Sequence, residues 1–286
     1  MTQMFSSLSR RHALGTVAGA AALSSLGRRA HAAAPDFADP AQFLTAVIKM
    51  RGATDGSLAL GWIKGTRYAV IDNKATPLFG ILAATFFSYT RVSALRFDMR
   101  FIELAYFTDL ATGKHLQSWT NPFTGKTVEV PLTRMGPSLT PVTPSGFDLT
   151  DNPRMQAMDA NHLFRPAVVA GDDVWVTEEI KISGDPPATG PRPFRYNEMT
   201  TYNANLADLS DPDRVRVPTK IQYQSLVGWT GWADMDGLNA MNMGRGSGRT
   251  EARVEDLPPY YLELSEKYHA DILNDPLAAL YRSGGE

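Results

Sequence analysis

The sequence predicts a mainly β protein: a single antiparallel β-barrel or strongly curved sheet, with one short helix near each end. Strand-like apolar segments recur along most of the chain and are separated by turns rich in Gly, Pro, Asn and Asp. Helical spacing of apolar residues occurs near the two ends, so strands do not alternate with helices, which excludes a doubly wound parallel sheet. Closure into a barrel is expected because it leaves no exposed strand edges.

The first 34 residues have the composition of an export signal. Ser9-Arg10-Arg11 opens a segment without acidic residues, a mildly apolar Gly/Ala-rich run follows, and Arg28-Arg29 precedes the small-residue string from Ala30 to Ala34. A basic region, a short apolar region and a small-residue cleavage site are the three parts of such a signal. The arginine pair and the low hydrophobicity favour the twin-arginine route, with an ordinary secretory signal as the alternative. We expect residues 1–34 to engage the twin-arginine export machinery and residues 35–286 to form one barrel domain, periplasmic or secreted.

Composition excludes several classes of function. Loss of the signal leaves 24 of the 28 basic residues against 30 acidic ones, a net charge of −6, which argues against a nucleic-acid partner. The chain has no cysteine, so disulfides and cysteine-ligated metal sites are excluded. No run approaches the roughly 18 apolar residues of a membrane-spanning helix, so we expect a soluble protein without a transmembrane segment. His115, His162 and His269 lack metal-ligand spacing, and we expect neither a metal nor a cofactor.

The N-terminal helix is expected to begin at Asp39-Pro40, an N-cap followed by proline at the first helical position. Phe43, Val47 and Met50 then recur at helical spacing, and Gly52 ends the pattern. Strands are expected at 57–62 and 67–71, joined by a turn at Lys64-Gly65-Thr66, and along the apolar run 78–92.

The stretch 95–131 is predicted to form three strands joined by two turns. Asp109–Lys114 and Asn121–Lys126 each place a glycine where a tight turn requires a positive φ. Residues 133–153 are expected to be a long loop at a rim or lid. Further strands are expected at 173–182, 194–202 and 219–229, followed by an irregular glycine-rich segment and a helix that begins after Asp256-Leu-Pro-Pro. The predicted domain is therefore lipocalin-like in form.

Two glutamates, the candidate catalytic residues, interrupt faces that are otherwise apolar. Alternation places Glu103 among Leu, Phe, Met and Ala side chains, and it places Glu178 among Val and Ile side chains. Desolvation raises the pKa of a buried carboxyl group toward the range useful for proton transfer. If both glutamates meet in one cavity, one is expected to be protonated and the other charged. The alternatives are that each pairs with an arginine from a neighbouring strand or that a bulge turns one outward.

The other candidate side chains are expected to contact a ligand. Each face of the strands at 194–202 and 219–229 combines polar and apolar residues. This mixture is typical of small barrels with a cavity, although a strand with one solvent-exposed face gives the same pattern. Tryptophans can line such a cavity or simply fill the core. The predicted ligand-binding residues are Arg100, Tyr106, Trp119, Asn197, Tyr202, Gln222, Gln224 and Trp229.

A family resemblance rests on the string Trp119-Thr-Asn121-Pro122-Phe-Thr124-Gly125, with Glu129 following it. Trp229 and Trp232 before a glycine-rich segment, and then Asp256-Leu-Pro258, fit the same pattern. In these features the chain resembles the family known as domain of unknown function 1838, many of whose members are exported from bacteria. The resemblance covers nearly all of the chain after the signal, and it implies no activity and no catalytic residues.

Two hypotheses of function follow from the sequence. In the first, the barrel binds a small, partly apolar ligand in its cavity. In the second, the same fold is a cofactor-free isomerase, lyase or hydrolase that uses Glu103 and Glu178 for acid–base chemistry.

Overall fold

The computed structural model describes residues 33–149, 156, 158–185, 193–228, 231–235 and 240–282. Residues Ala34–Glu286 form one compact unit. The predicted export signal lies almost entirely outside the described residues and stays a prediction. Among the helices in the described ranges, none is long and apolar enough to cross a membrane.

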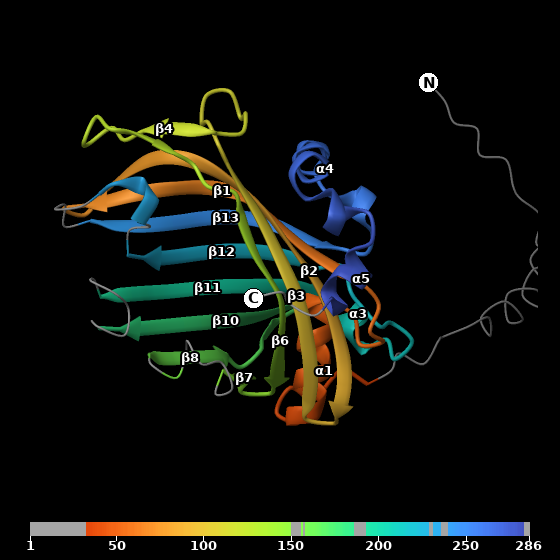
Figure 1. Ribbon diagram of the computed structural model, residues 1–286. Helices are drawn as coiled ribbons and strands as arrows, with labels where there is room; N and C mark the ends of the chain where they lie inside the picture. The colour runs from red at the N-terminus through yellow and green to blue at the C-terminus, as the bar shows by residue number, and fades with distance from the viewer. Residues whose placement is uncertain are drawn as a thin grey trace, which may run out of the picture. The chain divides into compact units, whose positions relative to one another are not determined.

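The fold is a strongly curved antiparallel sheet of the predicted class, nearly closed into a barrel. Strands β8 and β10 to β13 lie side by side as one wall, which β2, β3 and β6 cross (Figure 1). Strand β9 (Val168–Ala170) pairs only with β10. The order along the sheet is β7 (Gly146–Phe147), β6 (Thr133–Thr143), β3 (Arg96–Thr108), β2 (Lys74–Ser93), β1 (Ala59–Ile71), β13 (Met241–Glu251), β12 (Lys220–Val227), β11 (Phe194–Asn205), β10 (Asp173–Gly184) and β8 (Asp159–Phe164).

The two edge strands, β7 and β8, meet at a seam that closes the barrel without a regular ladder. The backbone N–H of Phe147 donates to Nδ1 of His162 at 2.7 Å, and the two rings stack with their centroids 3.6 Å apart. The N–H of Phe164 donates to the carbonyl of Ser145 at 3.2 Å. Gly146 permits this approach, because a Cβ there would lie 2.2 Å from the carbonyl oxygen of His162.

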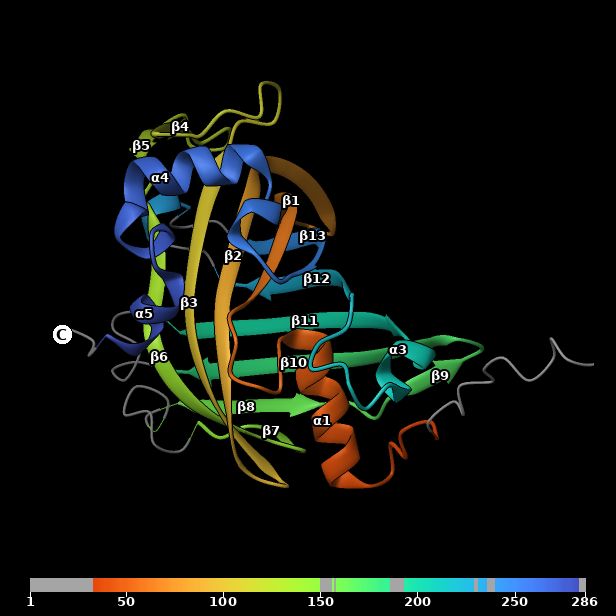
Figure 2. The same cartoon turned by 90° about the vertical axis from the view of Figure 1, so that its right-hand side faces the viewer.

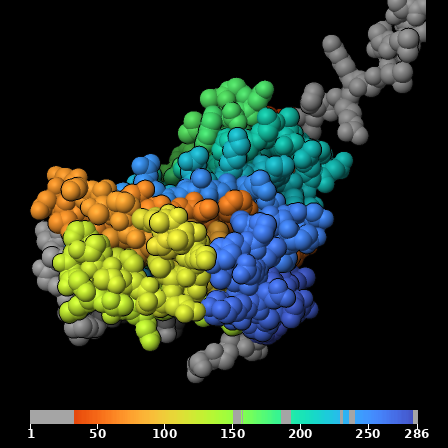
Figure 3. Space-filling view, turned by 90° about the horizontal axis from the view of Figure 1, so that it is seen from above, coloured from red at the N-terminus to blue at the C-terminus, as the bar shows by residue number. Residues whose placement is uncertain are grey.

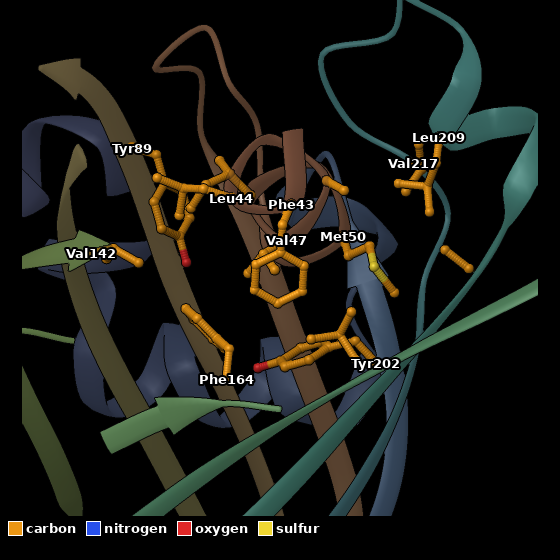
Figure 4. Close-up of a cluster of buried hydrophobic side chains, with 14 of the residues drawn as sticks. Phe43, Leu44, Val47, Met50, Tyr89, Val142, Phe164, Tyr202, Leu209 and Val217 are labelled. Carbon is orange, nitrogen blue, oxygen red and sulfur yellow. The ribbon is translucent and has the colours of Figure 1, made fainter. Parts of the chain in front are cut away.

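Helix α1 (Pro40–Arg51) fills one end of the barrel. It begins as predicted, with the Asp39 side chain accepting hydrogen bonds from the N–H groups of Ala41 and Gln42. Its apolar side chains lie between Tyr89 and Val142 on one side and Tyr202 on the other (Figure 4). This end of the barrel is therefore a packed core.

The C-terminal helices cover the outside of the sheet. Helices α4 (Pro259–Leu273) and α5 (Pro276–Tyr281) lie against the outer face of β2 and β3, whereas α3 (Leu206–Ser210) follows β11 near α1 (Figure 2). Short 3-10 turns, η1 (Gly231–Ala233) and η2 (Val254–Asp256), flank β13. In the view from above, the yellow segment that joins β3 to the hairpin of β4 (Ser118–Thr120) and β5 (Thr127–Glu129) lies between that hairpin and the blue helices α4 and α5 (Figure 3).

Three predicted elements are wrong. β1 continues through Lys64-Gly65-Thr66, and the turn to β2 is at Asp72-Asn73, where both residues have positive φ. Gly65 serves a close approach of strands, since a Cβ there would lie 2.0 Å from the carbonyl oxygen of Arg245. The expected loop at 133–153 is largely strand, because β6 pairs with β3. The expected irregular segment includes β13, which pairs with both β1 and β12.

The stretch 95–131 forms three strands and two turns, as predicted, but they do not form one meander. The turn glycines Gly113 and Gly125 both have positive φ. After β3, however, the chain leaves the barrel, and β4 and β5 make a separate two-stranded sheet. The buried side chain of Asn121 fixes this hairpin, because its Nδ2 donates to the carbonyl of Ala233 at 2.9 Å.

Candidate functional site

A cavity of about 250 Å³ lies inside the barrel, next to the core that α1 fills. Its walls are mostly apolar and come from both sides of the barrel, whereas a few charged and hydroxyl side chains project into it. Apolar lining residues include Ile63, Ile81, Ala83, Phe101, Ile180 and Ile221.

One polar group in the cavity is centred on Arg67 of β1. Its Nη1 donates to Oγ of Ser225 at 2.8 Å, and its Nη2 donates to the Tyr223 hydroxyl at 3.2 Å. Tyr223 in turn donates to Ser225 at 3.0 Å. The space for the guanidinium exists because residue 244 is glycine: a Cβ there would lie 2.7 Å from Nη1 of Arg67.

Two carboxyl groups face the same cavity from different strands. Glu103 of β3 accepts a hydrogen bond from the Thr85 hydroxyl at 3.4 Å. Glu198 of β11 accepts hydrogen bonds from the hydroxyls of Tyr196 and Thr200. Neither carboxyl group forms an ion pair with another described residue.

Burial raises the pKa of both carboxyl groups. For Glu198 the pKa rises from 4.5 to about 7; burial is the main cause, and the nearby charges of Glu103 and Glu178 add to it, against the opposing effects of Tyr196 and Arg67. The pKa of Glu103 is also raised by burial, against the opposing effects of Thr85 and Arg67. Glu198 therefore exchanges a proton near neutral pH.

A second polar group lies at the end that α1 fills, and both oxygens of its carboxylate have partners. Nη1 of Arg51, the last residue of α1, is 2.7 Å from Oε2 of Glu178. The same carboxylate accepts a hydrogen bond from Tyr202 at 3.0 Å, and its Oε1 is 2.7 Å from Nε2 of His162. The Arg51 guanidinium also lies 4.8 Å from the centroid of the Phe147 ring.

The hydrogen bonds of His162 define its tautomer. Because Nδ1 accepts the N–H of Phe147, the ring proton is on Nε2 and is donated to Glu178. Burial alone would raise the pKa of Glu178, but the attraction of Arg51 and the hydrogen bond from His162 outweigh it, and the pKa is lowered to about 2. Glu178 is therefore a permanent anion in a structural network.

Three of the predicted site residues meet in the cavity: Glu103, Glu178 and Tyr202. Alternation placed the two glutamates on the inner faces of β3 and β10. The catalytic role of Glu178 stays a prediction, and the structure gives its oxygens the partners Arg51, His162 and Tyr202. The carboxyl group that shares the open part of the cavity with Glu103 is Glu198.

Asn197, Gln222 and Gln224 do not line this cavity, and their role as ligand contacts stays a prediction. The inward side chains of their strands are Tyr196, Glu198 and Tyr202 on β11 and Ile221 and Tyr223 on β12, so the odd-numbered face of β11 and the even-numbered face of β12 point outward. Both glutamines are exposed.

Arg100, Tyr106 and Trp119 also lie away from the cavity. Arg100 stacks over the ring of Tyr281 with its Cζ 4.6 Å from the centroid, and the Tyr106 hydroxyl lies 3.0 Å from Oγ of Ser265, so both face the C-terminal helices. Trp119 packs edge-on against Phe79 in a separate apolar cluster. Trp229 lies outside the described residues.

Sequence reasoning missed Arg51, Arg67, His162 and Glu198. Arg51 ends a helix, where a basic residue is an ordinary finding, and its partner lies far away in the sequence. The sequence does give a hint for Glu198, because it shares one face of β11 with Tyr196, Thr200 and Tyr202. The other face of β11 contains a similar mixture of polar and apolar residues, so the sequence does not show which face points inward. Arg67 and His162 show no comparable pattern.

The described residues give no clear place for a metal ion. No three His, Asp or Glu side chains in this part of the chain gather closely enough to hold one. The polar groups of the cavity are instead suited to hydrogen bonding with an organic molecule and to proton exchange through Glu198.

Fold and site define a class: a nearly closed antiparallel barrel with an internal, partly polar cavity. No protein-family model matches the chain, and no curated protein matches it. Membership of domain of unknown function 1838 stays a prediction.

Replacing Glu178 with glutamine is expected to destabilise the fold strongly. The change leaves the Arg51 guanidinium buried without its counter-charge, which costs about 3–5 kcal/mol. Urea unfolding followed by circular dichroism measures this loss. The matched control is Glu179→Gln on the same strand, whose partner Arg165 is half exposed, and whose loss costs about 1 kcal/mol or less. Equal losses in the two variants would contradict the structural role given to Glu178.

Glu198 is expected to make stability fall as the pH rises. Because folding raises the pKa of this carboxyl group from 4.5 to about 7, the native state holds the proton more tightly than the unfolded state. This group therefore contributes a loss of stability from about pH 4.5 to pH 7, of the order of 3 kcal/mol.

The variant Glu198→Gln should lack this component, so its stability relative to wild type rises between pH 4.5 and pH 8. Urea unfolding across that range measures the difference. The exposed Glu263→Gln on α4 is the control and should follow the wild-type curve. A difference between Glu198→Gln and wild type that does not change with pH would disprove the assignment.

Proposed function

We propose that the barrel binds a small, partly apolar molecule in its internal cavity. The observation that carries this proposal is the cavity of about 250 Å³, whose walls are apolar and whose polar side chains are few. Sites for small molecules typically combine an apolar lining with a small number of placed polar groups. The network around Glu178 supports the end of the cavity, and Arg67, Glu103 and Glu198 supply the polar contacts.

The N-terminal sequence supports a place of action for this binding protein. The arginine pair, the apolar run and the small-residue string are consistent with export before binding takes place in the periplasm or outside the cell.

Filling the cavity is expected to abolish binding. The side chain of Ala83 lines the cavity, so Ala83→Phe places an aromatic ring in the space that a ligand would occupy. The neutral apolar dye N-phenyl-1-naphthylamine, whose fluorescence rises in apolar surroundings, is the probe. Wild type should bind it, and the variant should lose at least about tenfold in affinity, which corresponds to about 1.4 kcal/mol.

The matched control is Met199→Phe, an exchange on the outward face of β11, where the side chain is 39% exposed. It should bind the dye as wild type does. Native mass spectrometry of the purified protein adds an independent measurement, with a co-purified mass expected on the wild type and absent from Ala83→Phe. Full dye binding by Ala83→Phe would refute binding in this cavity.

A second candidate function is proton transfer without a cofactor. The observation that favours it is Glu198, whose pKa of about 7 suits an acid–base group, with Glu103 facing the same cavity. Glu198 here replaces Glu178 in the acid–base pair.

If this candidate is correct, the protein should accelerate exchange of α-protons in small cyclic ketones. Proton NMR in D₂O at neutral pH measures the loss of the α-proton signals. Glu198→Gln should lose the acceleration by about 10²-fold or more, whereas the exposed Glu263→Gln should retain it. Exchange no faster than in buffer across the ketone series would exclude this activity and leave the binding proposal intact.

A further inference from the structure

We propose that the molecule held in the cavity carries a cationic nitrogen, which sits between Glu103 and Glu198 and completes their missing ion pair. This inference rests on the proposed binding function and names the chemical class of the ligand: a small amphiphilic amine with an apolar body.

The two carboxyl groups project into the cavity from opposite walls. Glu103 is on β3 and Glu198 is on β11, which lie five strands apart along the sheet order. The curvature of the barrel nevertheless brings both of them to the wall of one cavity. A cation placed between them would contact both strands.

The protein does not supply that cation from its described residues. The charge of Arg67 acts against the rise in the pKa of both glutamates, but its guanidinium donates to Ser225 and Tyr223 and forms no ion pair with either carboxyl group. Arg51 pairs with Glu178 at the other end. Both glutamates are half-buried in the wall of the cavity, and without an ion-pair partner among the described residues they have capacity for an external one.

The charge of the cavity selects against an anionic ligand. Arg51 and Glu178 cancel, which leaves Arg67 against Glu103 and Glu198. An anion at Arg67 would meet two carboxyl groups nearby, whereas a cation between them gains two charge-assisted hydrogen bonds. The tyrosine rings of the lining, Tyr196 and Tyr223, add aromatic surface that favours a cation.

The proposed contact makes binding depend on pH. The groups that face Glu198 are Glu103, Tyr196, Tyr223 and Arg67, with the Glu178–Arg51 pair beyond them. Both tyrosines stay protonated through neutral pH, because burial raises the pKa of each, that of Tyr223 to about 12. A cationic ligand should therefore bind more tightly as Glu198 loses its proton between about pH 5.5 and pH 8.

The test uses three probes with the same six-carbon chain: hexylammonium, hexanol and hexanoate. Each is titrated against the full chain loaded with N-phenyl-1-naphthylamine, and displacement of the dye gives Kd. At pH 8 hexylammonium should bind about tenfold more tightly than hexanol, and hexanoate should bind most weakly. The preference for hexylammonium should fall several-fold at pH 5.5.

The isosteric variants Glu103→Gln and Glu198→Gln should each reduce hexylammonium affinity about tenfold at pH 8 and reduce hexanol affinity much less, so that the preference for the cation is lost. Circular dichroism of each variant shows whether it is folded. The exposed Glu263→Gln is the control for loss of a carboxylate elsewhere on the protein.

The outcomes separate this inference from the proposed function. If hexanol displaces the dye and hexylammonium binds no better, or if hexanoate binds most tightly, the inference of a cationic ligand is overturned while binding in the cavity stands. If none of the three probes displaces the dye and Ala83→Phe leaves dye binding unaffected, both proposals fail.

Discussion

The buried ion pair between Arg51 and Glu178 is the contact on which the closed end of the barrel depends. Taking these charges out of water carries a desolvation penalty of several kcal/mol per ion, which only a nearly complete set of partners offsets. Tyr202 and His162 complete that set, and His162 also accepts the N–H of Phe147 across the seam. One cluster thereby connects helix α1, strands β10 and β11, and the two edges of the sheet.

The partners of each carboxyl group explain how three glutamates in one cavity come to have different properties. Glu178 has a cation and two hydrogen-bond donors, and its pKa is lowered to about 2. Glu198 is half-buried and receives only hydroxyl donors, and its pKa is raised to about 7. The number and charge of the local partners separate a structural anion from a group that can exchange a proton or accept a cationic ligand.

Alternation in the sequence predicted the inner faces of β3 and β10 because the outer and inner residues of those strands differ clearly in polarity. The same rule failed for β11 and β12, where Met199 and Leu226 are exposed on the outside while Glu198 and Tyr223 point inward. Because polar side chains line the cavity, the inner and outer faces of these strands do not differ in polarity, and alternation cannot tell them apart. The Arg51–Glu178 pair was beyond prediction because the last residue of a helix and a residue of a distant strand share no local sequence pattern.

The position of the cavity follows from the sizes of the side chains at the two ends of the barrel. At one end α1 inserts large apolar side chains such as Phe43 and Met50, which leave a packed core. Further along, β1 and β13 carry glycines where the strands approach closely, and Gly244 leaves room for the Arg67 guanidinium beside Ser225. Even a methyl group at residue 244 would lie 2.7 Å from both Nη1 of Arg67 and Oγ of Ser225. Gly244 of β13 therefore leaves room for the polar half of the cavity.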